Sequence, residues 1–390
     1  NVPHLRFPEF SEEWDSFKLV ELGKFIGGGT PSSSNLSFWT GSIPWISSSD
    51  IKEDNINNIS ISRYITEDAI EKSATKYCPA PVILIVSRVG VGKVALSHTS
   101  LCTSQDFCNI IDIKCHPVFL SYNLLRTMKR KSREVQGTSI KGITSDELQK
   151  IRVFIPKNKD EQNKISNLLT LLDERIATQN KIIEDLKKLK SAIIDYAINS
   201  LDTDFAKFGS LYEMAGEGGT PTTSNASFYD NGKIPFIKID DLKQKYLTEN
   251  KDFITELGLQ KSSAWLVPTH SILFSNGATI GEISITTYPV CTKQGILGIV
   301  PKQNIDVEFL YYFMSSSYFK KAVSRIVTEG TMKTAYLKDI NNILCPIPTK
   351  EEQQEIAKIP SALNSKIDTE KSILKLFITQ KQHLLHQMFI

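Results

Sequence analysis

Two glycine clusters have the residue types and spacing closest to a nucleotide-binding motif. The first is Gly27-Gly28-Gly29-Thr30, and the second is Gly90-Val91-Gly92-Lys93, which contains a Gly-Lys pair. A phosphate-binding loop requires GxxxxGK followed by Ser or Thr, but Lys93 is followed by Val94. We therefore expect these glycines to form turns, in which glycine supplies a positive φ, and not a nucleotide site.

Cysteine and histidine are the other residue types that could carry chemistry. The chain has six of each: Cys78, Cys102, Cys108, Cys115, Cys291, Cys345, His4, His98, His116, His270, His383 and His386. No CxxC pair is present, and the spacing of Cys102, Cys108, Cys115 and His116 matches no common zinc site. The sequence also lacks GxSxG, HExxH and the Asn- or Asp-Pro-Pro-aromatic motif of amino-methyltransferases. We expect buried, reduced thiols, no metal, no cofactor and no catalytic residue.

Composition sets broad limits on the class of protein. The chain has 390 residues, 41% hydrophobic and 23% charged, with a net charge of +3. This suits two or three globular domains, and a near-neutral total neither requires nor excludes nucleic acid. The longest apolar run, Val82 to Val86, is too short to span a bilayer, and the N-terminus lacks a signal segment. We expect a soluble cytoplasmic protein.

The chain consists of two copies of one unit. Gly28-Gly29-Thr30-Pro31 recurs as Gly218-Gly219-Thr220-Pro221, and Ile43-Pro44-Trp45-Ile46 recurs as Ile234-Pro235-Phe236-Ile237. Later matches keep the same order: Thr103-Ser104-Gln105 with Thr292-Lys293-Gln294, Gly137-Thr138 with Gly330-Thr331, and Glu161-Gln162 with Glu352-Gln353. The offset stays between 189 and 193, which is far longer than the roughly 20–50 residues of a solenoid repeat. The second copy also replaces Lys93 by Glu282, which a phosphate site would not tolerate.

Each copy divides into a β-rich part and a helical tail. Short apolar runs such as Val82–Val86 and Ile110–Ile113 alternate with Gly, Ser, Asn and Pro, which predicts an α/β (mixed α+β) domain with substantial loops. The last 40 or so residues of each copy contain no glycine and show a helical apolar period. We therefore expect domains at 1–157 and 201–348, and long helices at 158–200 and 349–390.

The two helical tails share one heptad stripe. Its residues in the first helix are Ile165, Leu169, Leu172, Ile176, Ile183, Leu186 and Ile193, and in the second Ile356, Leu363, Ile367, Leu374, Phe377 and Leu384. The polar breaks also coincide, since Gln179 matches Glu370 and Lys190 matches Lys381 at an offset of 191. If each stripe is considered separately, two unrelated amphipathic helices that pack on their own domains would explain it. The matched stripes favour an antiparallel coiled coil, a spacer about 58 Å long, and Pro360 predicts a kink or a restart capped by Ser361.

Both copies contain a basic stretch near the Gly-Thr pair. A charge run is usually a solvated face, but its presence in both copies favours contact with DNA phosphates. The predicted phosphate-binding residues are Arg126, Lys131, Arg133, Lys141, Lys320, Lys321, Arg325 and Lys333. Polar loops that differ between the copies could read base edges. Their candidates are Ser33, Ser34, Ser48, Arg88, Gln105, Thr223, Lys238, Asn276, Lys293 and Gln294.

Several of these motifs together resemble a known family. They are the opening Leu5-Arg6-Phe7-Pro8-Glu9-Phe10 with Trp14, the repeated Gly-Gly-Thr-Pro and Ile-Pro-aromatic-Ile, and the Pro and Glu-Gln entries to two long helices. Over its whole length the sequence resembles the specificity (S) subunits of type I restriction-modification systems.

The resemblance implies two target-recognition domains, each of which reads one half of a split double-stranded DNA target, and helices that set the gap. It also implies two methyltransferase (M) subunits that carry S-adenosylmethionine, and restriction (R) subunits that use ATP and Mg. Two alternatives are a self-contained methyltransferase or nuclease, which would act alone with S-adenosylmethionine or magnesium, and a protein scaffold without a DNA role.

Overall fold

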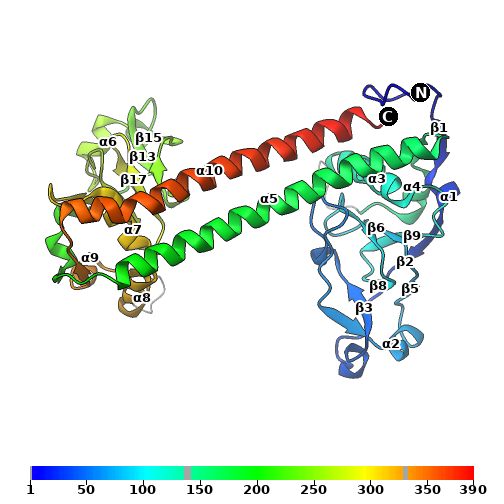
Figure 1. Ribbon diagram of the computed structural model, residues 1–390, viewed down its shortest axis with the longest axis horizontal. Coiled ribbons are helices and arrows are strands. Elements are labelled where there is room, and N and C mark those ends of the chain that lie inside the picture. Colours follow the sequence, from blue (N-terminus) through cyan, green and yellow to red (C-terminus); the bar gives the residue numbers. More distant parts are fainter. Residues whose placement is uncertain (1, 136–141, 328–332) are drawn as a thin grey trace. The chain divides into compact units, whose positions relative to one another are not determined.

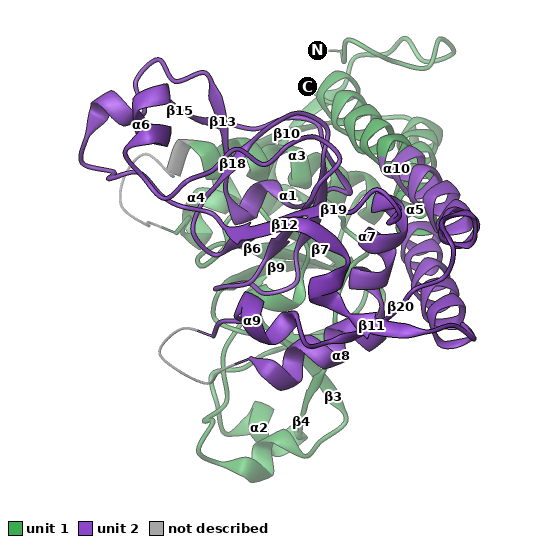
Figure 2. Ribbon diagram, turned by 90° about the vertical axis from the view of Figure 1, so that its left-hand side faces the viewer, with its two compact units in different colours: residues 1–180, 372–390 green, residues 181–371 purple. Residues whose placement is uncertain are grey.

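The structure is a computed structural model that describes residues 2–135, 142–327 and 333–390, and the chain forms two compact units in it. The first unit contains Asn1–Asn180 together with Ser372–Ile390, and the second contains Lys181–Lys371 (Figure 2). Each unit therefore combines a globular region with segments of both long helices.

The first unit is built on small sheets. Its first four-stranded sheet has the order β2 (Lys24–Gly27), β9 (Phe107–Ile111), β6 (Val82–Val86) and β7 (Val94–Ser97). A second four-stranded sheet contains β4 (Arg63–Ile65), β3 (Ile43–Ile46), β8 (Leu101–Thr103) and β5 (Tyr77–Cys78), and β1 (Asp15–Lys18) pairs with β10 (Arg152–Ile155). The helices are α1 (Leu19–Leu22), α2 (Glu67–Glu71), α3 (Pro117–Val135) and α4 (Ser145–Lys150). Every residue of β6 is buried, as its unbroken apolar run predicts.

The second unit repeats this arrangement. Its main sheet has the order β12 (Tyr212–Glu217), β19 (Ile296–Pro301), β16 (Ile272–Ser275), β17 (Ile283–Thr286) and β14 (Tyr246–Leu247). A three-stranded sheet contains β15 (Asp252–Ile254), β13 (Ile234–Ile237) and β18 (Cys291–Thr292), and β11 (Phe205–Lys207) pairs with β20 (Leu344–Pro346). The helices are α6 (Glu256–Gln260), α7 (Val307–Ser315), α8 (Ser317–Ile326) and α9 (Leu337–Ile340).

The strand order confirms that the chain is a duplication. The order β2-β9-β6-β7 corresponds to β12-β19-β16-β17, and β4-β3-β8 corresponds to β15-β13-β18. Even the register is kept, since Trp45 faces Cys102 across a parallel pair and Phe236 faces Cys291. Two copies of a mixed α/β domain are therefore present.

The glycine clusters have two different roles. Gly90 and Gly92 have φ values of 87° and 113°, so they supply the positive φ that the sequence predicts. That explanation is wrong for Gly28 and Gly29, which have no positive φ. A Cβ atom on Gly28 would lie 2.0 Å from the carbonyl oxygen of Ser104, and one on Gly29 would lie 2.3 Å from that of Ala74. This pair is glycine because two loops approach its backbone closely.

Two long helices, α5 (Lys159–Asn199) and α10 (Lys350–Gln387), contribute to both cores (Figure 1). The stripe residues buried in the structure are Ile165, Leu169, Leu172, Ile183 and Ile367, and the other stripe residues are half-buried. Near the C-terminal ends the buried positions move by one residue, from Ile193 to Ile194 in α5 and from Leu384 to Leu385 in α10. A straight helix drifts by about 20° per heptad relative to a 3.5-residue repeat, which accounts for this shift.

The predicted restart at Pro360 is wrong. The helix α10 runs without a break from Lys350 to Gln387, with a buried Pro360 inside it. Ser361 is not a cap, because its hydroxyl donates to Glu308 Oε2 at 3.1 Å and accepts from Lys245 Nζ at 3.1 Å. Pro360 is buried within the second unit, and this burial offsets the loss of the backbone hydrogen bond that proline removes from the helix.

The cysteines are structural. All six are free, and five are buried, with Cys115 half-buried. Burial raises the pKa of the Cys78 thiol to about 11, which suits an unreactive thiol. Within the described ranges, no group of three or more His, Cys, Asp or Glu side chains could hold a metal ion. No described helix is both long and apolar enough to cross a membrane.

Candidate nucleic-acid interface

Two of the predicted base-reading loops contact each other in each copy. Thr30, in the Gly-Gly-Thr-Pro loop, donates its hydroxyl proton to Gln105 Oε1, and the backbone N–H of Gln294 donates to Thr220 Oγ1 at 3.4 Å. Candidates exposed in this structure are Ser33, Ser34, Arg88, Gln105, Thr223, Lys238, Lys293 and Gln294. The fold thus brings two separate polar loops of each copy to one exposed place.

Two candidates are placed differently. Ser48 is half-buried, and its carbonyl oxygen accepts from Lys93 Nζ at 3.1 Å. Asn276 is 2% exposed, and its amide nitrogen donates to the Ala335 carbonyl oxygen at 3.2 Å. In this conformation Asn276 supports a loop and does not present its amide to a base.

An ion pair with opposite polarity in the two copies distinguishes their surfaces. In the first copy Arg63 on β4 faces Trp45 on β3, lies 4.6 Å from its ring centroid, and forms an ion pair with Asp50. In the second copy Asp252 on β15 faces Phe236 on β13 and pairs with Lys238 at 2.7 Å. The cation comes from β4 in one copy and from the loop after β13 in the other.

Sequence reasoning missed Arg63, whose side chain is 40% exposed. A signal was available, because Arg63 and Asp252 each precede an aromatic residue followed by Ile-Thr-Glu. An alignment of the copies through that motif places an arginine opposite an aspartate.

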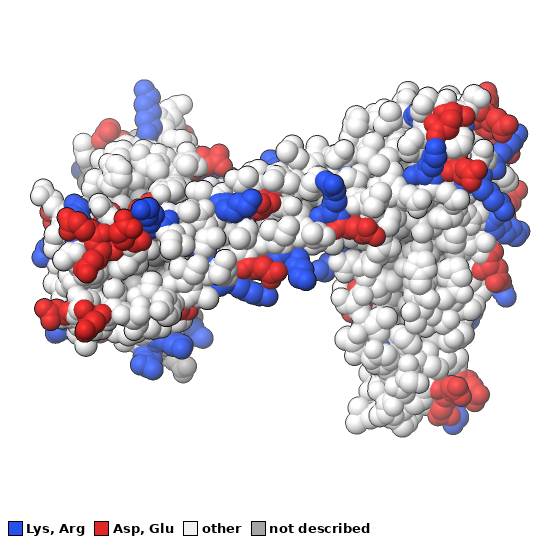
Figure 3. Space-filling model, in the orientation of Figure 1, with Lys and Arg blue, Asp and Glu red and all other residues white. Residues whose placement is uncertain are grey.

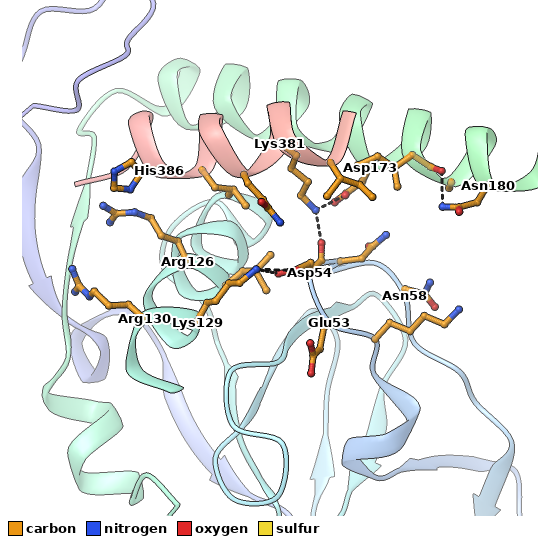
Figure 4. Close-up of a pocket in the computed structure, with 18 of the residues that line it drawn as sticks. Glu53, Asp54, Asn58, Arg126, Lys129, Arg130, Asp173, Asn180, Lys381 and His386 are labelled. Atoms are coloured by element: carbon orange, nitrogen blue, oxygen red, sulfur yellow. Dashed lines mark hydrogen bonds and ion pairs between the residues drawn. The ribbon is translucent and has the colours of Figure 1, made fainter. Parts of the chain in front are cut away.

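Two of the four predicted phosphate-binding residues of the first copy, Arg126 and Arg133, lie on α3 at a cleft of about 1000 Å³, which we call the first cleft. Arg126, Arg130 and Arg133 line it, together with Lys129 and Lys381. Figure 4 shows Arg126 and Arg130 extending beneath His386 of α10. Among the side chains that the structure describes, Arg130 and Arg133 are exposed and have no hydrogen-bond or ion-pair partner.

Other cations of the first copy are engaged or lie elsewhere. The Arg126 guanidinium is half-buried and donates to the Ile390 carbonyl oxygen at 2.6 Å, and burial lowers its pKa. Lys129 pairs with Asp54 at 2.8 Å. Lys131 is half-buried on α3 outside the cleft lining. Lys141 and the two Gly-Thr pairs lie outside the described residues.

An equivalent cleft of about 360 Å³ lies in the second unit, and we call it the second cleft. Lys320 lines it and is exposed, as are Lys321, Arg325 and Lys333. Lys320 and Lys333 also line a mainly apolar pocket with Phe274 and Met314. Of the predicted cations of this copy, Lys320 therefore belongs to the cleft itself.

Each cleft contains lysines of the long helices that the sequence marked only as breaks in the heptad stripe. Lys381 is buried and pairs with Asp173, which also accepts from the Tyr122 hydroxyl at 2.7 Å. Lys190 donates to Asn364 Oδ1 at 3.0 Å. Burial, together with the nearby Asp173 charge, raises the pKa of Tyr122 well above its usual range. The visible helix surfaces also carry adjacent charges of both signs (Figure 3).

A matched pair of glutamines fixes the start of both long helices. Gln162 donates to the Pro156 carbonyl oxygen at 2.8 Å and accepts from the His116 backbone N–H at 2.9 Å. Gln353 repeats this with the Pro348 carbonyl oxygen at 2.9 Å and the Asp306 N–H at 2.7 Å. The recurring Pro and Glu-Gln motif therefore joins each helix to the domain before it.

Comparison with known proteins gives the same picture across both copies. A family model described as "Type I restriction modification DNA specificity domain" matches residues 11–188 and 202–376. The MjaIX type I restriction enzyme specificity subunit of Methanocaldococcus jannaschii is 27% identical over 94% of this chain and 90% of its own. The Escherichia coli EcoR124I/EcoR124II specificity subunit is 34% identical over 54% of each chain.

Solved structures agree at the level of the fold. The S subunit of a type I restriction-modification system from M. genitalium aligns over 100% of this chain and 99% of its own, with a TM-score of 0.57 and 19% identity. A chain from a study of the assembly of a type I system aligns over 99% and 98%, with a TM-score of 0.63 and 14% identity.

Proposed function

Because the chain belongs to the family of type I restriction-modification DNA specificity proteins, we propose that each of its two domains reads one half of a bipartite DNA target. The observation that supports this proposal is the ion pair beside the aromatic residue of β3 and β13, because its cation and anion change places between two copies of the same fold. Arg63 and Asp252 occupy equivalent places next to the same aromatic position, yet they have opposite charge. Because DNA bases are distinguished by their donors and acceptors, equivalent surfaces on which the cation and the anion change places suit different half-sites.

Phosphate contacts supply affinity in this proposal, and loops supply specificity. The exposed guanidiniums of Arg130 and Arg133 and the ammonium of Lys320 are suited to phosphate, because they have no anionic partner among the described residues. The domain limits and site residues predicted from the sequence remain predictions within this function.

The two long helices form the spacer of this proposal, as an antiparallel coiled coil. The polar contacts within the units support it, since Asp173 of α5 contacts Lys381 of α10 and Lys190 of α5 contacts Asn364 of α10. Lys190 comes after Asp173 along α5, whereas its partner Asn364 comes before Lys381 along α10, by the same number of residues. Helix length would then set the gap between the half-sites.

The partners follow from the family and from the helices. The chain would direct adenine methylation by two methyltransferase subunits docked along the helices, and restriction by further subunits. S-adenosylmethionine, ATP and Mg would be bound by those partners and none by this chain. The relatives are named specificity subunits, which agrees with a non-catalytic role. Cytoplasmic location, where such a complex would meet DNA, stays a prediction.

Exchange of one domain tests the function directly. When the chain is expressed with its methyltransferase partner, replacing residues 1–157 by those of another family member is expected to change one half of the methylated sequence only. The readout is a genome-wide map of methylated adenine. A change in both halves, or in neither, would contradict separate reading. Methylation by the purified chain with S-adenosylmethionine alone would favour the enzyme alternative.

Neutralising a cleft arginine tests phosphate contact. Arg133→Gln is expected to weaken binding of all DNA sequences alike and to reduce the slope of log K against log salt by about 0.9. The measurement is DNA binding by the complex with methyltransferase between low and physiological salt. Arg152→Gln is the matched control, because Arg152 is exposed on β10 and bonds Ser16 at 3.3 Å, away from the cleft. An unchanged slope for Arg133→Gln would exclude a phosphate contact there.

A further inference from the structure

The second cleft has an excess of positive charge that its own residues do not balance. Six lysines line it: Lys187, Lys190, Lys243, Lys245, Lys320 and Lys371. The acidic residues that line it are Glu282 and Asp368. Its volume of about 360 Å³ lies at the lower end of the range for pockets that bind small ligands. The cleft therefore has room for an anion and an electrostatic reason to hold one.

Most of the six lysines are already paired. Lys187 pairs with Glu184 at 2.7 Å, Lys243 with Asp240 at 3.6 Å, and Lys371 with Asp368 at 2.9 Å. Lys245 is buried, forms an ion pair with Glu308, and donates to the Tyr312 hydroxyl at 2.8 Å. Lys190 and Lys320 have no carboxylate within ion-pair distance in the part of the chain that the structure describes.

Lys190 is in an unfavourable position for an unpaired charge. It is half-buried on α5, and its ammonium donates to the neutral amide oxygen of Asn364 at 3.0 Å. Burial lowers the pKa of Lys190, the Asp368 charge opposes that shift, and the charges of Lys371, Lys245 and Lys320 add to it. An ammonium that is partly removed from water and has no carboxylate in direct contact is costly, so an external anion would stabilise it.

In the first unit, the lysine equivalent to Lys190 has an anionic partner. At an offset of 191, Lys381 corresponds to Lys190 and Asp173 corresponds to Asn364. Lys381 is paired with Asp173. The duplicated chain thus carries a carboxylate beside the lysine in one copy and an amide of nearly the same shape in the other. Asp368 lines the same cleft, but it accepts from Asn364 Nδ2 at 3.0 Å and pairs with Lys371 at 2.9 Å, so Lys190 has no carboxylate in direct contact among the described residues.

We propose that the second cleft binds a phosphate group between Lys190 and Lys320, at the place where the first unit has the carboxylate of Asp173. The phosphate belongs either to the DNA backbone or to a free ion such as inorganic phosphate, which have the same recognition chemistry. Only the DNA source rests on the function proposed above. Lys245 contributes through its field, since its own hydrogen bonds are satisfied within the protein.

The test replaces Asn364 by aspartate and so places a carboxylate next to Lys190. The full-length chain and its Asn364→Asp variant are titrated calorimetrically with inorganic phosphate, at an ionic strength matched with chloride. N364D is expected to weaken phosphate binding at least tenfold, because the internal carboxylate neutralises Lys190. Lys320→Gln, an exposed change that should not affect folding, is expected to weaken it severalfold. Lys358→Gln is the control, because Lys358 is exposed and pairs with Glu355 outside the cleft.

The reciprocal variant and a measurement of DNA binding distinguish free phosphate from the DNA backbone as the source of the bound phosphate group. Asp173→Asn is expected to create phosphate binding in the first cleft, by giving it the lysine and amide of the second. If free phosphate binds and N364D weakens it, the free-ion source is supported, even if sequence-specific DNA binding by the chain fails. If free phosphate does not bind but N364D reduces the salt slope of DNA binding by about 0.9, the DNA source is supported. If N364D and K320Q change neither quantity, the site does not exist.

Discussion

Replacing Glu161 by alanine is expected to lower the free energy of unfolding of the first unit by about 3 kcal/mol, the lower end for removing one partner of a buried ion pair. The Glu161 carboxylate is 1% exposed and accepts from Arg6 Nε at 2.7 Å and Arg6 Nη2 at 2.8 Å. It also accepts from Trp14 Nε1 at 3.1 Å. Its removal leaves the Arg6 guanidinium with the Glu12 carbonyl oxygen as its remaining acceptor and the buried indole N–H of Trp14 without one.

The same change at the equivalent position of the second unit is the control. Glu352 matches Glu161 at an offset of 191, but within the described part of the chain its exposed carboxylate accepts only from the backbone and hydroxyl of Thr349, both at 2.8 Å. Glu352→Ala is expected to leave urea denaturation close to that of the unaltered chain. Equal losses for the two variants would show that Glu161 acts as a helix cap and does not anchor the N-terminal segment.

The role of Glu161 shows how far the sequence could predict this fold. The motif with Arg6 and Trp14 and the recurring Glu-Gln pair are both visible in the sequence, and both are involved in the same contact. Their meeting could not be predicted, because Arg6 and Glu161 are 155 positions apart and, among the residues that the structure describes, Glu352 of the second copy accepts from Thr349 and not from an arginine. The backbone of Leu5 also donates to the Gln387 carbonyl oxygen at 3.0 Å, so the two ends of the chain lie together (Figure 1).

The duplication was predictable because it depends on residue identity alone, and the strand order confirms it. The side-chain directions of single polar residues were not. Arg126 and Arg133 both belong to a basic run on α3, yet Arg126 is half-buried against Ile390 while Arg133 is exposed. Asn276 belongs to a polar loop but is buried beneath Ala335. Exposure of such residues depends on packing partners that are distant in sequence.

The breaks in the heptad stripe are visible in the sequence, but their consequence is not. A polar residue at a seam position is usually a cost in stability that fixes register. Here Lys190 and Lys381 each line a cleft against a globular region, so the breaks coincide with the two candidate anion-binding places. Only the structure shows that the carboxylate of Asp173 contacts the lysine in one cleft and the uncharged amide of Asn364 contacts it in the other.

The Lys381–Asp173 pair is accordingly the second contact whose loss is expected to have a large effect. Lys381→Met should lower the free energy of unfolding of the first unit by about 3–5 kcal/mol, because it leaves the Asp173 carboxylate buried with only the Tyr122 hydroxyl as a donor. The side chains of both partners are 4% exposed. Lys381 also donates to the Asp54 carbonyl oxygen at 2.6 Å, which would lose that donor.

A double-mutant cycle separates the buried charge from the lost packing. Asp173→Asn alone is expected to cost less than Lys381→Met, since it reproduces the lysine and amide pair of the second unit. The double variant K381M/D173N should be more stable than K381M by at least about 1 kcal/mol, because it removes the charge that K381M leaves unpaired. Urea denaturation in phosphate-free buffer measures all four proteins. Additive losses would mean that Asp173 and Lys381 are not coupled, and the charge comparison between the two clefts would fail with them.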